Sequence, residues 1–65
     1  MKILLREVMQ RRHLTIRQVA IMTKLPKSTI ERIVLEEISP TMNQMERLAA
    51  GLHVSISDLY RSRYQ

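Results

Sequence analysis

Apolar residues recur at helical spacing along almost the whole 65-residue chain. Residues three or four apart share one face of a helix, and a run of such pairs predicts an amphipathic helix. Long alternating apolar and polar runs and two-residue glycine turns, the usual signs of strands and hairpins, do not occur. The pattern predicts an all-α fold, a compact five-helix bundle with helices over residues 3–12, 16–23, 27–35, 42–50 and 56–62.

Residues that start or stop helices fall at the borders of these stretches. A Ser or Thr followed three residues later by Glu, Gln or Asp can satisfy free amides of the first helical turn. Four such pairs occur, namely Thr15 with Gln18, Ser28 with Glu31, Thr41 with Gln44, and Ser55 with Asp58. Pro26 and Pro40 interrupt the pattern between helices, and Gly51 stands where a C-terminal cap is expected.

The apolar faces predict a core that contains neither Phe nor Trp. A chain of this length buries only about 60% of its unfolded surface, so the core must be efficiently built. Methionine fills gaps in such cores, and we expect Met9, Met42 and Met45 inside and Met22 near the surface. The other inward positions are Leu5, Val8, Val19, Ala20, Ile30, Ile33, Leu48, Ala49, Ile56, Leu59 and Tyr60, with Leu14, Leu25, Leu52 and Val54 in the connectors. Arg12 shares the face of Leu5 and Val8 but is expected in solvent.

The pattern over residues 16–35 predicts two short helices joined by a tight corner. Val19 and Ala20 form the inner face of the first helix, and Ile30 and Ile33 that of the second. The small Ala20 lets the two helices cross closely around one shared apolar wedge. The outer face of the second helix then carries Lys27, Ser28, Glu31 and Arg32. This is how a helix-turn-helix presents a recognition helix to the major groove of DNA.

The net charge of +5 is unevenly distributed. Residues 1–32 carry eight Lys or Arg and two Glu, a balance of +6, whereas residues 33–65 carry three Arg and four acidic residues, a balance of −1. A basic half indicates a face directed at a polyanion, although an ordinary solvated surface is the alternative.

The composition excludes several classes of protein. The chain has no cysteine and two histidines, which argues against disulfides and metal sites. No nucleophile constellation, acid–base pair or phosphate loop suggests an enzyme, a cofactor or a small-molecule substrate. No apolar run approaches the roughly 20 residues of a membrane span. Together with the lack of an export signal, this leads us to expect a cytoplasmic protein.

Several matches at fixed spacing carry a family resemblance. They are Leu14-Thr15, Val19-Ala20, Leu25, Ser28-Thr29-Ile30, Arg32-Ile33, Pro40-Thr41, Leu48-Ala49 and the run from Leu52 to Tyr60. Over about residues 5–60 the chain resembles the phage repressor and Cro type of domain, the XRE-type helix-turn-helix. The resemblance implies a lambda repressor-like DNA-binding domain that takes up residues 1–65, with the motif formed by the second and third helices.

The chain departs from the family pattern at several positions. Lys24 replaces the usual corner glycine, which costs on the order of 1 kcal/mol in left-handed backbone. Ile16 replaces a phosphate-binding Gln, so we expect Arg17 to substitute for it. Pro26 stands where a capping Ser or Thr is common. Met9 and Val34 replace an Arg–Glu pair, and losing both charges together can be neutral or favourable.

The resemblance and the outward geometry favour the same DNA-contacting residues. Base contacts are expected from Lys27, Ser28, Arg32 and Glu31, and phosphate contacts from Arg17, Lys24, Thr29 and Thr15. Two alternatives stay open, since Ser28 can cap its helix with Glu31 and Arg32 can pair with Glu36 one turn further on.

The expected function is sequence-specific binding of double-stranded DNA by a small regulator, most simply a repressor. One domain reads only a few base pairs, so we expect a homodimer on half-sites about 34 Å apart. Candidate dimer surfaces are the fourth helix, the loop 36–40 with Ile38, and the tail Tyr60–Gln65. The alternatives are an antitoxin or phage-switch autorepressor of the same fold and a protein-interaction module that has lost DNA binding. A membrane-surface helix is disfavoured by the caps and prolines.

Overall fold

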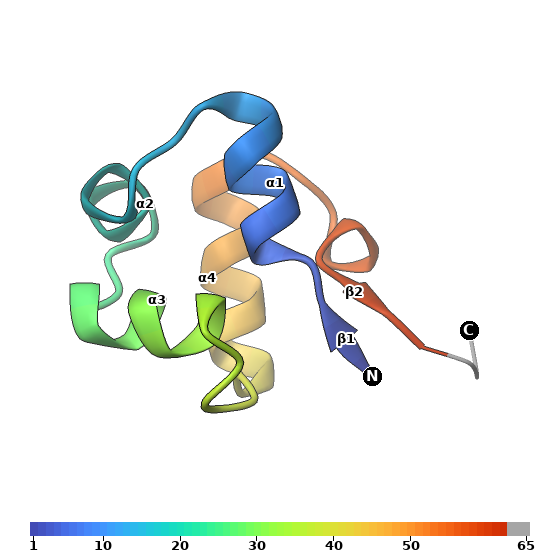
Figure 1. The fold of residues 1–65 in the computed structure, drawn as a ribbon. Helices are drawn as coiled ribbons and strands as arrows, with labels where there is room; N and C mark the ends of the chain where they lie inside the picture. Colours follow the sequence, from blue (N-terminus) through green and yellow to red (C-terminus); the bar gives the residue numbers. More distant parts are fainter. Residues whose placement is uncertain (63–65) are drawn as a thin grey trace.

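The computed structural model describes residues 1–62. This part of the chain forms four α-helices, α1 (Leu5–Arg12), α2 (Ile16–Thr23), α3 (Lys27–Val34) and α4 (Met42–Leu52), and one short 3₁₀ helix, η1 (Ile56–Asp58). Two strands, β1 (Lys2–Ile3) and β2 (Tyr60–Arg61), lie at its ends. The helices α2 and α3 occupy one side of the molecule, the strands occupy the other, and α1 and α4 stand between them (Figure 1).

The prediction of five helices is wrong at both ends of the chain. β1 and β2 pair antiparallel, with Lys2 opposite Arg61 and Ile3 opposite Tyr60. The amide of Leu4 extends this contact by donating to the carbonyl of Leu59 at 2.8 Å. The first helix therefore begins at Leu5, and the expected fifth helix is a single 3₁₀ turn followed by a strand. Strands of two residues are too short to show the alternation by which strands are recognised in a sequence.

The core is largely the predicted one. Eight side chains have less than 2% of their surface exposed, namely Leu5, Val8, Val19, Ile30, Ile33, Leu48, Leu52 and Leu59. Met9 and Met45 belong to the same cluster, and Val34 packs against it. Met9 and Val34 therefore occupy apolar surroundings, in agreement with the interpretation that they replace a charged pair without stranding a charge.

One residue assigned to the core, Met42, lies at the surface instead. Met42 is 66% exposed because it is the first residue of α4, one turn ahead of the buried Met45. Arg12 is exposed, as expected, and its guanidinium donates to the carbonyl of Leu52 at the end of α4. This contact keeps the Arg12 charge in solvent while it satisfies a free helix-end carbonyl.

Two of the four predicted capping boxes form in full. Thr15 accepts from the amide of Gln18 at 3.1 Å and Thr41 from that of Gln44 at 3.1 Å, and each glutamine side chain returns a bond to the cap amide. Before η1, Ser55 donates its hydroxyl and its amide to Asp58, at 2.8 and 3.1 Å. These two bonds lower the pKa of the Asp58 carboxyl from its ordinary value.

The predicted capping box between Ser28 and Glu31 is wrong. α3 begins at Lys27 with Pro26 as its N-cap, and no side chain caps this helix. A capping box needs its Ser at the N-cap, whereas Ser28 lies inside the first turn. Its hydroxyl is exposed and is not used to cap the helix.

Gly51 does not cap α4, contrary to the sequence prediction. The helix continues through Gly51 to Leu52, and His53 caps it in left-handed backbone with φ 57°. Lys24 has the left-handed backbone expected at the corner, with φ 60°. The glycine is needed for a different reason, because a Cβ at Gly51 would lie 2.4 Å from the carbonyl oxygen of Met22 in α2. It allows α4 to approach the end of α2.

Gly51→Ala is expected to destabilise the domain by roughly 1–3 kcal/mol, the usual range for overpacking. The Cβ clashes with backbone atoms of Met22 and Thr23, which cannot move as a flexible side chain can. At an unobstructed helical site the same change would stabilise by up to about 1 kcal/mol. Urea unfolding followed by circular dichroism measures the sign directly. Ala50→Gly, at the exposed neighbouring position, should cost only the helix-propensity difference, and a stabilised Gly51→Ala variant would refute the close approach.

Candidate DNA interface

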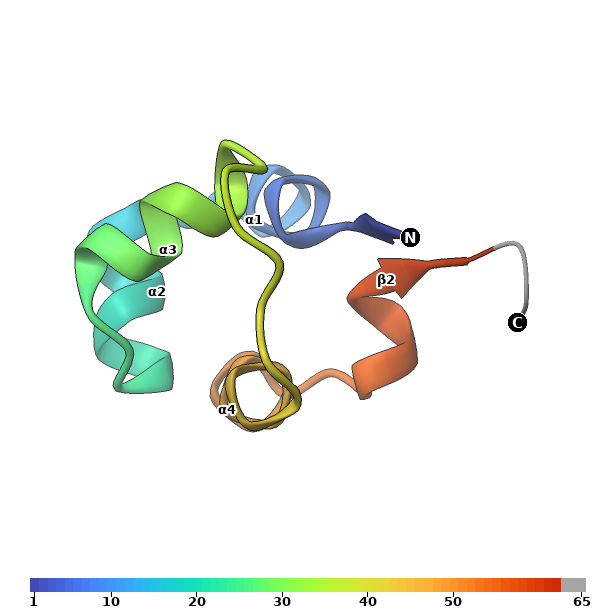
Figure 2. The ribbon, with the colours of Figure 1, turned by 90° about the horizontal axis from the view of Figure 1, so that it is seen from below.

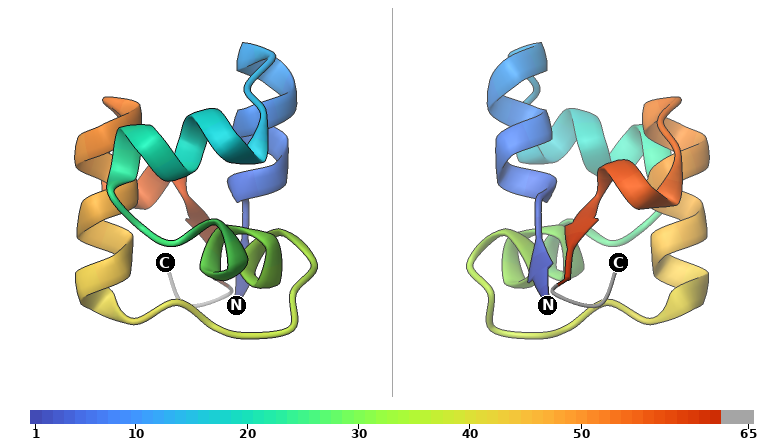
Figure 3. Two further views of the ribbon diagram at one scale, coloured as in Figure 1. Left: turned by 90° about the vertical axis from the view of Figure 1, so that its left-hand side faces the viewer. Right: turned by 90° about the vertical axis from the view of Figure 1, so that its right-hand side faces the viewer.

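The exposed side of the α2–α3 pair is the candidate functional surface. α3 lies across the front of the molecule below α2, with the corner between them (Figure 3, left). Val19 and Ile30 are 0% exposed, Ile33 is 1% exposed, and Leu25 in the corner is 7% exposed. The predicted apolar wedge is therefore confirmed, and α3 packs against the core through its inner face.

The outward positions of α3 carry the residues expected at base edges. Lys27, Ser28 and Arg32 are exposed, and Glu31 and Thr29 are half-buried. Because α3 has only eight residues, these positions cover its whole outer surface. Lys27 and Arg32 supply donors, Ser28 supplies a hydroxyl that can donate or accept, and Glu31 supplies acceptors at the margin of the surface.

The cations of this surface are not neutralised by carboxylates. In residues 1–62 the one ion pair joins Lys2 and Glu7, at 3.5 Å on the β1–α1 side. The alternative pairing of Arg32 with Glu36 does not form in the described structure. Arg32 is therefore available to a ligand, as is Lys27 at the other end of the helix.

The expected phosphate-contacting residues flank α3. Arg17 is exposed in the first turn of α2, and Lys24 is exposed at the corner between the helices. Thr15 is exposed too, and its oxygen caps α2 by accepting from Gln18. Its hydroxyl hydrogen can still be donated, so capping and phosphate binding are compatible.

The cationic surface ends abruptly after α3. Glu36 and Glu37 follow within three residues of its last residue and are exposed, and Leu35 is 59% exposed. Acidic side chains repel phosphates, so the loop after α3 marks the limit of the surface that suits DNA.

Arg47 is a cation that the sequence reasoning did not place near this surface. It lies on α4 and lines a hollow of about 420 Å³ together with Lys24 and Met22. The only sequence signal that places Arg47 near α2 is its position four residues before Gly51. Residues at that spacing share a helix face, and Gly51 touches α2. The close approach of Gly51 to α2 could not itself be predicted from the sequence.

A small helical domain with a buried two-helix corner and an exposed cationic second helix is a helix-turn-helix DNA-binding domain. The family model of the Cro/C1-type HTH DNA-binding domain matches residues 4–62, and the chain belongs to this family. The family assignment implies DNA binding by a transcription regulator. Comparisons with curated proteins and with solved structures gave no match.

No helix in residues 1–62 is long and apolar enough to cross a membrane. Within the same range, no three His, Cys, Asp or Glu side chains gather as metal ligands would.

Proposed function

We propose that the domain binds a specific operator in double-stranded DNA and represses transcription by blocking polymerase there. The observation that carries the proposal is the division of α3 into two sides. Ile30 and Ile33 fix its inner side in the core, while Lys27 and Arg32 leave two unpaired cations on its outer side. A rigid helix with this division fits the major groove, which is about 12 Å wide.

Each outward residue of α3 has a base edge suited to its chemistry. Lys27 and Arg32 donate to O6 and N7 of guanine, and Arg32 can do so with two hydrogen bonds. Ser28 can form hydrogen bonds with several bases, since its hydroxyl is both donor and acceptor. Glu31 accepts from the amino group of cytosine and repels phosphate, so it adds selectivity. Arg17, Lys24, Thr29 and Thr15 contact the phosphates on either side of the groove.

Two copies occupy a two-fold operator in this proposal. An eight-residue recognition helix reaches only a few base pairs, too few to define a site in a genome. Half-sites one helical turn apart, about 34 Å, double the sequence that is read. The regulator then competes with polymerase for the operator, which is the simplest route to repression.

Selection from random duplexes at near-physiological salt tests the proposal. The expected result is an enriched motif with two-fold symmetry. Binding should weaken steeply as salt rises, with log K falling by about 0.9 per log salt for each phosphate contact. Arg11→Ala is the matched control, because Arg11 is an exposed cation in the last turn of α1, outside the α2–α3 pair. Salt-insensitive binding without an enriched motif would favour a protein-interaction module instead.

A further inference from the structure

A hollow lies between the end of α2 and the second half of α4, beside the corner that leads into α3. The end of α2 stands next to α4 in two different views (Figure 2; Figure 3, left), and Gly51 allows the close approach there. The hollow has a volume of about 420 Å³ and is lined by Met22, Thr23, Lys24, Arg47, Ala50 and Gly51. It adjoins the candidate DNA interface at Lys24, but none of the outward residues of α3 lines it. We call it the α2–α4 hollow.

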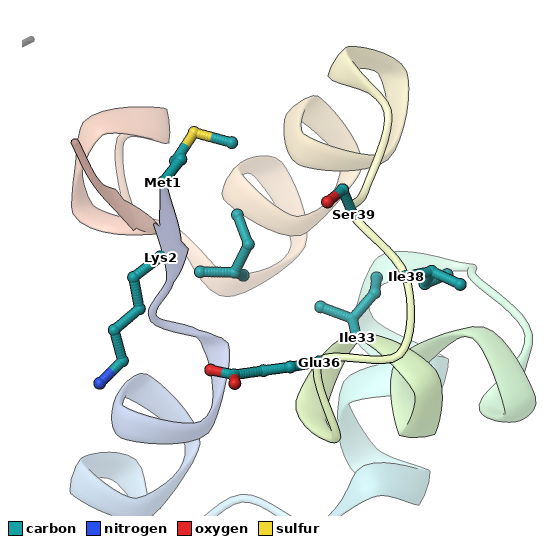
Figure 4. A pocket seen from close by; sticks show the side chains of 7 residues that line it. Met1, Lys2, Ile33, Glu36, Ile38 and Ser39 are labelled. Atoms are coloured by element: carbon teal, nitrogen blue, oxygen red, sulfur yellow. The ribbon is translucent and has the colours of Figure 1, made fainter.

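The charged residues of the α2–α4 hollow are both cations. Lys24 comes from the corner and Arg47 from α4, and no carboxylate lines the hollow. The one ion pair in residues 1–62 joins Lys2 and Glu7, so neither cation has an ionic partner in this range. The hollow of about 430 Å³ between β1 and the loop after α3 differs, because Lys2 and Glu36 line it together (Figure 4). The α2–α4 hollow therefore suits an anionic ligand.

The rest of the α2–α4 hollow is mainly apolar. Met22 is 38% exposed, Ala50 is exposed, and Gly51 has no side chain. Thr23 is 3% exposed, and its hydroxyl already donates to the carbonyl of Val19 at 2.7 Å. Methionine adapts its shape to irregular partners, which suits this surface to docking. A ligand in the hollow therefore meets apolar side chains and two positive charges.

Charge complementarity and apolar contact together favour an acidic segment of another protein. An arginine guanidinium matches a carboxylate with two parallel hydrogen bonds, and opposite charges across an interface help to select the partner. An apolar side chain next to the carboxylate would cover Met22 and Ala50. The phosphates of DNA would satisfy both cations but would leave this apolar surface in water. DNA therefore accounts for only half of the hollow's chemistry.

We propose that the α2–α4 hollow binds a short protein segment in which an apolar residue lies between Asp or Glu residues. The apolar side chain packs on Met22 and Ala50, and the carboxylates pair with Arg47 and Lys24. Because Lys24 is also expected to contact a DNA phosphate, the segment and the operator exclude one another. The partner then releases the regulator from its operator. This exclusion rests on the function proposed above, whereas binding of the segment does not.

Selection from short random peptides against the full chain, without DNA, tests the binding site. The expected result is an enriched motif with an apolar residue flanked by Asp or Glu. Arg47→Gln should then lower the affinity for a synthetic peptide with this motif roughly tenfold, because it removes a charge-assisted pair. Arg11→Gln is the matched control, since it also removes one exposed arginine from a helix but lies outside the hollow. A selection that enriches no acidic motif, or equal losses for the two variants, would overturn the proposal.

Met22→Gln tests the apolar part of the site without changing any charge. It should lower the affinity for the peptide several-fold and leave the affinity for DNA unchanged. Ile21→Gln is the matched control, because Ile21 is the exposed neighbour of Met22 and does not line the hollow. Circular dichroism checks that both variants fold. Peptide affinity that Met22→Gln leaves unchanged would contradict docking on the apolar surface.

Competition with the selected operator separates this inference from the proposed function. The peptide should displace the chain from the operator, whereas the same peptide with Asn or Gln in place of its acidic residues should not. If the peptide binds but displaces no DNA, the exclusion is wrong. If Arg47→Gln weakens binding to all duplexes and reduces the salt slope by about one, Arg47 contacts phosphate and the proposal is overturned. A chain that binds the peptide but no duplex would refute the proposed function and leave the peptide site standing.

Discussion

Replacing Ile30 by alanine is expected to remove most of the stability of the domain. Ile30 is 0% exposed at the centre of the inner face of α3, and truncating a buried isoleucine to alanine costs 2–5 kcal/mol. The free energy of unfolding of a native domain is about 5–15 kcal/mol, and that of a domain of this length lies near the lower limit. Urea unfolding should show the loss as a much lower midpoint, and DNA affinity should fall with it because α3 is no longer held in place.

The matched control is Ile21→Ala, which makes the same chemical change on the outside of α2. Ile21 is 70% exposed, and exposed substitutions rarely change stability by more than about 0.5 kcal/mol. Alanine is also the better helix former. If the two variants unfold at the same urea concentration, Ile30 does not clamp the recognition helix and the proposed mechanism loses its basis.

The helix-turn-helix could be predicted closely because its signals are local. The expected helix over residues 16–23 has the bounds of α2, and that over 27–35 ends one residue later than α3. The Thr15 box fixes the start of α2, and Ile30 and Ile33 fix the inner face of α3 within one turn. The prediction of a fifth helix was wrong because β2 forms by pairing with β1 at the other end of the chain. No local pattern encodes a partner so distant.

Gly51 illustrates a second limit of the sequence. A glycine near the end of a predicted helix has two ordinary uses, a left-handed cap or a close approach to another backbone. Only the position of Met22 decides between them, and that position depends on how α2 and α4 pack. His53 takes the cap instead, in a left-handed conformation that non-glycine residues rarely adopt.

The candidate site was predictable to the level of which residues point outward. Burial of Ile30 and Ile33 places Lys27, Ser28 and Arg32 on the other side of α3 by helix geometry alone. The sequence left two competing uses open, a cap for Ser28 and an ion pair for Arg32, and the described structure forms neither. The DNA contacts themselves stay a prediction, since they depend on a molecule whose shape and sequence the chain does not contain.

Arg32→Ala and Arg17→Ala are expected to affect DNA binding in different ways. Arg32 lies on the outer face of the recognition helix, and a bidentate contact to guanine contributes about 1–3 kcal/mol of discrimination. Its loss should lower affinity for the selected operator roughly 5- to 150-fold, since 1.4 kcal/mol is a factor of ten. Affinity for unrelated duplexes should change far less, so the ratio between specific and non-specific binding falls.

Arg17 lies in the first turn of α2, outside the recognition helix. If it contacts a phosphate, Arg17→Ala should weaken binding to all duplexes by a similar factor and reduce the salt slope by about one. Both variants should fold, because both sites are exposed and alanine favours helix. Titrations of operator and scrambled duplexes at several salt concentrations separate the two effects. A uniform loss for Arg32→Ala, or a loss confined to the operator for Arg17→Ala, would reverse the assignment of base-reading and phosphate-binding residues.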